Sequence, residues 1–286
     1  MTIHARMLSY LALPFFAAGM FMTAAPAAHA AETIHVSKNW SGYTASGGSY
    51  SAVSATWIVP AVSENPNPLS ASAAWVGIGG LSDPNLIQAG TQAVLENGQV
   101  SYQAWYETLP DSEHALPLAL HPGDTVSVSI REVLAGLWQI HVTDQTTGQG
   151  TQTSLFYDSS NSSAEWIVER PLAIMDDGTG YLPLNDFGTV SFQNVSAGVN
   201  GDIVPLRAID SQQVVMSSSG SSLLAAPSAI TSDGSGFSVS YLTRKQSAQY
   251  LSSVHRVFRP TTPESSNIPA SSIGEIGRGA LIHIVF

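Results

Sequence analysis

The sequence predicts an all-β protein, a β-sandwich of two antiparallel sheets. Short runs rich in Val, Ile, Thr, Trp and Tyr recur along the chain, and Gly, Pro, Asn, Asp and Ser separate them. Helical periodicity is hard to find, whereas residues 124–130, DTVSVSI, alternate between apolar and polar side chains. Short alternating strands divided by turn residues are typical of antiparallel sandwiches.

The first 30 residues are expected to be a secretory signal peptide. Arg6 precedes an apolar run over residues 7–22, and APAAHA at 25–30 ends in a small-x-small pattern. These are the parts of a cleavable signal, so we expect a cut after Ala30 and a secreted protein. A membrane anchor is the alternative, but Pro14 interrupts a run that is already short for a bilayer span.

The remaining chain divides by composition into a domain over residues 31–242 and a C-terminal extension of unknown role over 243–286. The domain holds four basic residues against 19 acidic ones. Nucleic acid and anionic membranes are therefore poor partners. So few basic groups leave little positive charge to repel at low pH, which favours adaptation to acid; an acidic surface kept for solubility is the alternative.

Several kinds of chemistry have no support in the sequence. There is no cysteine, no H-E-x-x-H, no G-x-S-x-G, no phosphate-binding G-x-x-x-x-G-K and no Asp-Thr-Gly. No cofactor and no metal are expected; DDGTG at 176–180 is interpreted as an acidic turn, with a calcium site as the alternative. The groups that could still carry out catalysis are carboxylates and amides. Paired carboxylates indicate glycoside hydrolysis, and a carboxylate with an amide indicates water attack on a carbonyl.

Residues 162–171, SSAEWIVERP, predict a β-strand with an unusual face. Alternation places Glu165, Ile167 and Glu169 on one side and Trp166 and Val168 on the other. Two carboxylates beside an isoleucine indicate either a solvated edge or the floor of a site.

The run SYQAWYE at 101–107 follows the same rule. Gln103, Trp105 and Glu107 share one face. Taken alone, Trp105 is a core residue.

Seven motifs in order make the chain resemble a known family. They are NWSGY at 39–43, TWIVP at 56–60, SAAWVGIGG at 72–80, LIQAG at 86–90, SYQAWYE at 101–107, AEWIVE at 164–169 and DFGTVSFQN at 186–194. Together they resemble the eqolisins, the glutamic peptidases, over about residues 39–242. The resemblance implies a concanavalin-like β-sandwich that hydrolyses proteins in acid.

The resemblance also implies site residues. The catalytic pair falls on Glu165 and Gln88. A carboxyl group can accept a proton from the attacking water and return it to the leaving nitrogen, while an amide N–H stabilises the oxyanion. The residues expected to line the substrate cleft are Trp75, Trp105, Glu107 and Gln103.

The chain departs from this family at identifiable positions. Gly79 and Gln103 stand where the family often has Asp, so we expect a different proton network and a higher pH optimum. Residues 31–38 are too short for the propeptide of fungal members, and the cysteines of those members are missing.

The leading hypothesis is therefore a secreted, acid-acting endopeptidase with protein or peptide substrates and a monomeric state. One alternative is a glycoside hydrolase that uses Glu165 and Glu107. The other is a glycan- or peptide-binding β-sandwich without turnover.

Overall fold

The computed structural model describes residues 34–63, 67–175, 178–219, 222–254 and 283–285. The expected signal peptide, most of the C-terminal extension, and Asp176 and Asp177 of the DDGTG motif lie outside the described residues. Within the described ranges, no helix is both long and apolar enough to cross a bilayer.

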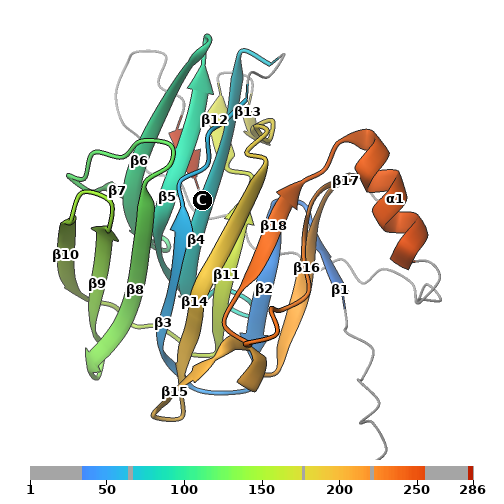
Figure 1. The fold of residues 1–286 in the computed structure, drawn as a ribbon. Helices are drawn as coiled ribbons and strands as arrows, with labels where there is room; N and C mark the ends of the chain where they lie inside the picture. The colour runs from blue at the N-terminus through green and yellow to red at the C-terminus, as the bar shows by residue number, and fades with distance from the viewer. Residues whose placement is uncertain (1–33, 64–66, 176–177, 220–221, 255–282, 286) are drawn as a thin grey trace, which may run out of the picture. The chain divides into compact units, whose positions relative to one another are not determined.

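Strands dominate the described chain (Figure 1). They are β1 (Ile34–Ser37), β2 (Trp40–Ser46), β3 (Tyr50–Ile58), β4 (Leu69–Gly79), β5 (Leu86–Glu96), β6 (Gln99–Thr108), β7 (His114–Ala115), β8 (Thr125–Leu134), β9 (Leu137–Asp144), β10 (Gln149–Phe156), β11 (Ser163–Glu169), β12 (Leu172–Met175), β13 (Gly178–Tyr181), β14 (Thr189–Val199), β15 (Asp202–Pro205), β16 (Ser211–Ser219), β17 (Ser222–Pro227), β18 (Phe237–Tyr241) and β19 (His283–Val285). A 3-10 turn spans Leu206–Ala208, and the helix α1 spans Arg244–Val254.

The main sheet runs in the order β10-β9-β8-β3-β14-β18-β17-β16-β2-β11-β4-β5-β6-β7, with β1 beside β16 and β15 beside β14. Apart from β1 on β16, its ladders are antiparallel. A separate small sheet has the order β13-β12-β19.

Strand β14 belongs to both layers of the sandwich. Its first part, through Phe192, pairs with β18, and from Gln193 onward it pairs with β3. The register shifts between Gln193 and Ser196. Such a bulge bends a strand, and here it lets one hydrogen-bonded sheet form two facing layers. The predicted β-sandwich of antiparallel sheets is confirmed.

The core fills the space between the two layers. Its largest fully buried members come from both layers: Tyr43, Trp57, Trp138, Trp166, Phe192 and Phe237. The alternation predicted for residues 124–130 is confirmed, because Val126, Val128 and Ile130 are all fully buried. Burial of apolar area on this scale is the main source of stability in a chain without disulfides.

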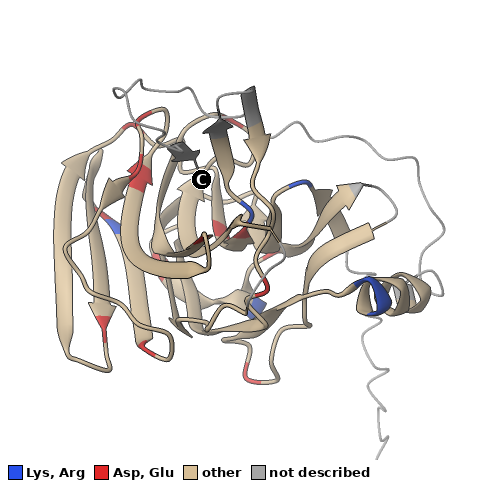
Figure 2. Cartoon of the chain, turned by 90° about the horizontal axis from the view of Figure 1, so that it is seen from above, with Lys and Arg blue, Asp and Glu red and all other residues tan. Residues whose placement is uncertain are grey.

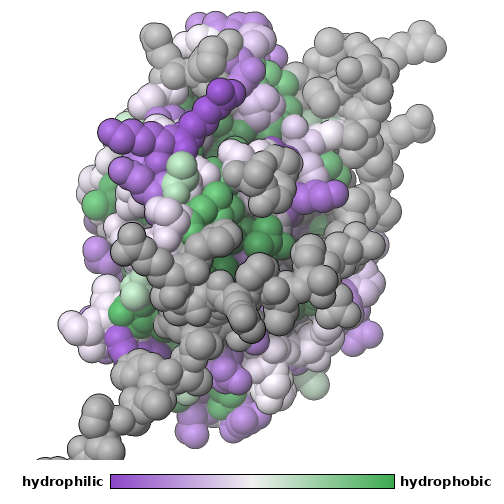
Figure 3. All heavy atoms as spheres, turned by 90° about the vertical axis from the view of Figure 1, so that its right-hand side faces the viewer, coloured by the Kyte–Doolittle hydropathy of each residue, from purple (hydrophilic) through white to green (hydrophobic). Residues whose placement is uncertain are grey.

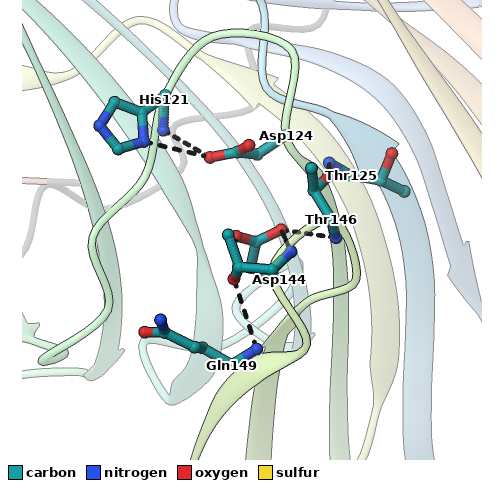
Figure 4. Close-up of polar contacts among 7 residues, drawn as sticks. His121, Asp124, Thr125, Asp144, Thr146 and Gln149 are labelled. Atoms are coloured by element: carbon teal, nitrogen blue, oxygen red, sulfur yellow. Dashed lines mark hydrogen bonds and ion pairs between the residues drawn. The ribbon is translucent and has the colours of Figure 1, made fainter.

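The described chain carries few Lys and Arg residues, as the sparse blue positions of Figure 2 show. Hydrophobic and hydrophilic residues are interspersed on the face seen in Figure 3. Aspartates order some of the turns (Figure 4): Asp144 accepts hydrogen bonds from the Thr146 N–H at 2.8 Å and the Thr147 hydroxyl at 2.6 Å. Asp124 accepts the His121 N–H at 2.7 Å. Side-chain acceptors of this kind satisfy the backbone where the chain reverses.

The helix α1 was not expected from the sequence, which lacks clear helical periodicity there. It packs on β17: the Ser247 hydroxyl accepts the Leu223 N–H at 2.8 Å, and Tyr250 and Leu251 pack beside buried Val215. The strand β19 lies within the C-terminal extension and pairs with β12.

Candidate active site

Five adjacent strands, β2, β11, β4, β5 and β6, carry the predicted site residues. We call the side of these strands that is turned away from the sandwich core the site face. The register aligns Thr44, Glu165, Gly77, Gln88 and Glu107 as successive Cα partners across the five strands. Neighbouring strands are about 4.8 Å apart, so the Cα atoms of Glu165 and Gln88 are separated by about 10 Å.

Gly77 leaves a gap between the two predicted catalytic side chains. A Cβ atom there would lie 2.9 Å from Leu86 Cδ1, 2.9 Å from Trp75 Cζ3 and 3.3 Å from Gln88 Cβ. The neighbours have thus closed around a position that carries no side chain. Glu165 and Gln88 face each other across it.

Glu165 is fully buried, and neither of its carboxyl oxygens has a hydrogen-bond partner among the described residues. Burial raises its pKa well above the ordinary value, the charge of Asp83 raises the pKa further, and the Ser163 hydroxyl offsets part of the rise. Ser163 Oγ, like both carboxyl oxygens, has no hydrogen-bond partner among the described residues. A buried acceptor without a partner is costly and is characteristic of functional sites.

Thr44, Glu165, Gly77, Gln88 and Glu107 form one row of Cα partners. Within this row Gln88 is fully buried, and its side chain is bonded to that of Glu107. Its Nε2 donates to Glu107 Oε2 at 2.6 Å, and its Oε1 has no partner among the described residues. Burial and the charge of Glu169 raise the pKa of Glu107 to about 9, against the opposing effect of Gln88. Glu107 is therefore a neutral acid at low pH.

The next row of the site face is aromatic. Ile167, Trp75, Gly90 and Trp105 are aligned across β11, β4, β5 and β6. Both tryptophans are fully buried in a cluster with Ile167 and Trp40. Gly90 makes room for them, since a Cβ there would lie 2.6 Å from Trp75 Cβ.

Glu169 is a buried carboxyl group that was placed on this face by alternation but not assigned to the site. It accepts the Trp75 indole N–H and the Asn39 amide, each at 2.8 Å. Burial raises its pKa to about 8, and these donors limit the rise.

Gln103 lies on the same face, four residues from Glu107 along β6, or about 13 Å at the rise of a strand. It accepts the Gln92 amide at 2.8 Å, and the same nitrogen lies 3.2 Å from Glu113 Oε1. Burial raises the pKa of Glu113 to about 7.

The structure thus brings all six predicted residues onto one face. Glu165, Gln88 and Glu107 share a row, and Trp75, Trp105 and Gln103 occupy the next two rows. Sequence reasoning missed Gln92, which alternation from Gln88 would have found. It also missed Glu113 and Asp83, which lie in loops and have no periodic signal. Within the described ranges, no three His, Asp or Glu residues are grouped so that they could hold a metal ion.

Comparison with known proteins gives one consistent result. The model of the Peptidase A4 family matches residues 38–241. Aspergillopepsin-2 of Aspergillus niger is 30% identical over 192 residues, which cover 59% of this chain and 67% of that protein. Scytalidopepsin B of Scytalidium lignicola is 29% identical over 190 residues, covering 63% and 71%.

Solved structures agree with these relatives. Scytalido-glutamic peptidase with a transition state analog inhibitor has a TM-score of 0.61 at 27% identity, covering 72% of this chain and 98% of that one. Aspergilloglutamic peptidase from Aspergillus niger has a TM-score of 0.53 at 30% identity, covering 60% and 99%.

The sandwich, the family match and these relatives define a hydrolase of the glutamic endopeptidase class. The chain belongs to the peptidase A4 family, the eqolisins.

Proposed function

We propose that this protein is a secreted, acid-acting endopeptidase in which Glu165 and Gln88 act together on the scissile peptide bond. Residues 31–242 would form the peptidase domain after removal of the signal peptide. The observation that carries the proposal is the pair itself: a buried carboxyl group and a buried amide oxygen, both without described partners, belong to residues that flank Gly77 in the register of β11, β4 and β5.

Each group has a role that its chemistry allows. Glu165 accepts a proton from water as the water attacks the carbonyl carbon, and returns the proton to the leaving nitrogen. Gln88 keeps a second N–H after bonding Glu107, and this N–H stabilises the oxyanion. Its free Oε1 orients the water. Because an amide does not titrate, Glu165 is the member of the pair that sets the pH dependence.

The raised pKa of Glu165 suits both steps. When ionised, the group is a stronger base than an ordinary carboxylate, and the proton that it takes from water is the one that it returns to the leaving nitrogen. One carboxyl group can therefore serve first as base and then as acid within a single turnover.

Glu165, Gln88, Trp75 and Trp105 are all fully buried in this structure. For a substrate peptide that reaches this face, Trp75 and Trp105 would offer apolar contacts to its side chains, with Glu107 and Gln103 as polar neighbours.

The alternatives named from the sequence have less support. Glu107 lies three strands from Glu165, about 14 Å between Cα atoms, and is bonded to Gln88. Glycosidase carboxyl groups act together across about 5–9.5 Å, whereas here Gln88, bonded to Glu107, lies between the two glutamates in the register. Neither this alternative nor a binding module without turnover agrees with the peptidase family match.

The test is Glu165→Gln, with Glu96→Gln as the matched control. Glu96 is exposed at the end of β5, so its substitution should leave cleavage unchanged. Glu165→Gln removes the proton acceptor and donor while keeping the shape, and should lower kcat by at least about 10²–10⁴-fold. Cleavage of denatured protein at about pH 4 measures both. A folded Glu165→Gln protein with near wild-type kcat would contradict the proposal.

A further inference from the structure

The loop between β4 and β5, residues 80–85, folds back at the end of the site face next to Glu165. Gly77 is the partner of Glu165, and Ile78 is the partner of Ala164. The following residue, Gly79, has a left-handed φ of 90°, and a Cβ there would lie 2.2 Å from the Asn85 carbonyl oxygen. The loop backbone therefore occupies the space of a side chain just beyond the catalytic row.

Asp83, in this loop, is held by two hydrogen bonds. Its Oδ1 accepts the Asn85 N–H at 2.9 Å, and its Oδ2 accepts the Ser162 hydroxyl at 3.0 Å. Ser162 directly precedes β11, three residues before Glu165. A second link joins the same two segments, because Asn85 Nδ2 donates to the Asp158 carbonyl oxygen at 3.2 Å.

Asp83 is thereby fixed at the entrance of the strand that carries Glu165. Its charge adds to the effect of burial in raising the pKa of Glu165, which is itself fully buried. Tyr50 of β3 is the titratable group whose pKa the charge of Glu165 raises. Glu107 of β6 and Glu169 of the same strand as Glu165 are further titratable groups of the site face. Among the described residues that shift the pKa of Glu165, Asp83 supplies the only charge, and no basic residue opposes it.

We propose that Asp83 is a positioning residue for the reaction, anchored by Ser162 and Asn85 so that its negative charge bears on Glu165. The inference rests on the proposed function of Glu165. Repulsion between the two carboxylates favours the protonated form of Glu165. Glu165 therefore ionises at a higher pH, and its ionised form is a stronger base for the attacking water, than it would be without Asp83. Gly79 leaves this end of the face without a side chain, and the loop supplies a carboxylate there instead.

The test compares pH profiles of kcat/KM, which report the ionisation of essential groups in the free enzyme. Asp83→Asn keeps the size and can still accept from Asn85, but it removes the charge. In Asp83→Asn, the limb of the kcat/KM profile that reports the ionisation of Glu165 should move to lower pH. Asp83→Glu should restore the wild-type profile. Asp158→Asn is the matched control, because it removes an exposed charge from the neighbouring segment and should leave the profile in place.

Two further measurements separate the possible failures. The carboxyl carbon of Glu165, titrated by NMR in wild-type protein and in Asp83→Asn, should show the same shift to lower pH without any use of turnover. Ser162→Ala releases one anchor of Asp83 but keeps its charge. Ser162→Ala should also move the kcat/KM profile to lower pH. It replaces Asp83→Asn as the test if Asp83→Asn does not fold.

Identical profiles for Asp83→Asn and Asp158→Asn would overturn the inference while leaving the proposed function intact. An active Glu165→Gln protein would instead overturn the proposed function itself. The two results are distinguishable because the NMR titration of wild-type protein and Asp83→Asn follows the proton on Glu165 whether or not Glu165 is the catalytic group.

Discussion

The side-chain amide of Gln88 donates a hydrogen bond of 2.6 Å to the buried carboxyl group of Glu107, while it also faces Glu165 across Gly77. One amide thus lies between two carboxyl groups of the same row. With an amide in the middle, the row has a fixed donor that no change of pH removes.

Gln88→Ala is expected to lower kcat by about 10²–10³-fold, the usual effect of losing one oxyanion donor. A weak residual rate should remain, because Glu165 can still exchange protons with water. Gln92→Ala, on the same strand and the same face, is the control and should lower kcat far less. Steady-state kinetics on a peptide at about pH 4 measures both. A folded Gln88→Ala protein with full kcat would remove Gln88 from the mechanism.

Gly77→Ala is expected to reduce both stability and turnover. The added methyl group would press on Leu86 and Trp75 at 2.9 Å and would narrow the space that separates Glu165 from Gln88. Overpacking of this kind typically costs about 1–3 kcal/mol.

The control for this substitution is Gly150→Ala on the edge strand β10, where a Cβ would lie 3.0 Å from the Thr143 hydroxyl oxygen. It should affect the melting temperature but not kcat. Wild-type kcat in Gly77→Ala, with the expected loss of stability, would show that the gap is not needed for catalysis.

Stability should be greatest in acid and should fall as the pH rises. Glu113, Glu169 and Glu107 have pKa values raised to about 7, 8 and 9, mainly by burial, and that of Glu165 is also raised. In the unfolded chain they would ionise near pH 4.5. Their contribution is therefore fully present below that pH and is lost as the pH rises through the folded-state values. Asp144 acts in the opposite direction, since the Thr147 hydroxyl, against burial, lowers its pKa.

The measurement is the melting temperature from pH 3 to 9. Glu107→Gln, which cannot ionise, should flatten the decline at the alkaline end. The exposed Glu96→Gln should not. A wild-type melting temperature that rises from pH 5 to pH 8 would contradict the prediction.

Inhibitors should separate this mechanism from other hydrolytic ones. Because the chain has no cysteine, no G-x-S-x-G and no Asp-Thr-Gly, we expect no inhibition by thiol reagents, fluorophosphonates or pepstatin. EDTA should also leave kcat unchanged. Stoichiometric inactivation by a fluorophosphonate, or loss with EDTA that one metal restores, would point to a different catalytic group.

Strand alternation explains how much of the site could be predicted. Because side chains alternate along a strand, Glu165 must share a face with Glu169, and Gln103 must share a face with Trp105 and Glu107. This holds for any arrangement of the other strands. The buried positions of Val126, Val128 and Ile130 follow from the same rule. Family resemblance was needed to select Gln88, because a single glutamine in a strand carries no signal of its own.

Other features depend on contacts between distant segments and have no local signal. The alignment of Glu165 with Gln88 depends on the registers of β11, β4 and β5, which turns and packing set jointly. Asp83 and Glu113 lie in loops, where no periodicity reports burial. The helix α1 has polar residues throughout its first turn. It is stabilised by its packing on β17 and by reciprocal hydrogen bonds between Thr243 and Gln246 at its N-terminus.

The row that runs from Thr44 to Glu107 also bears on when activity can begin. Its strands follow the order β2, β11, β4, β5, β6 across the sheet, so β11 must insert between β2 and β4, which both precede it in the chain. Pairings between segments far apart in sequence form slowly, because closing the intervening loop costs entropy first. A nascent chain therefore carries Glu165 and Gln88 without an assembled pair. The same topology that builds the site delays its assembly until these strands have paired.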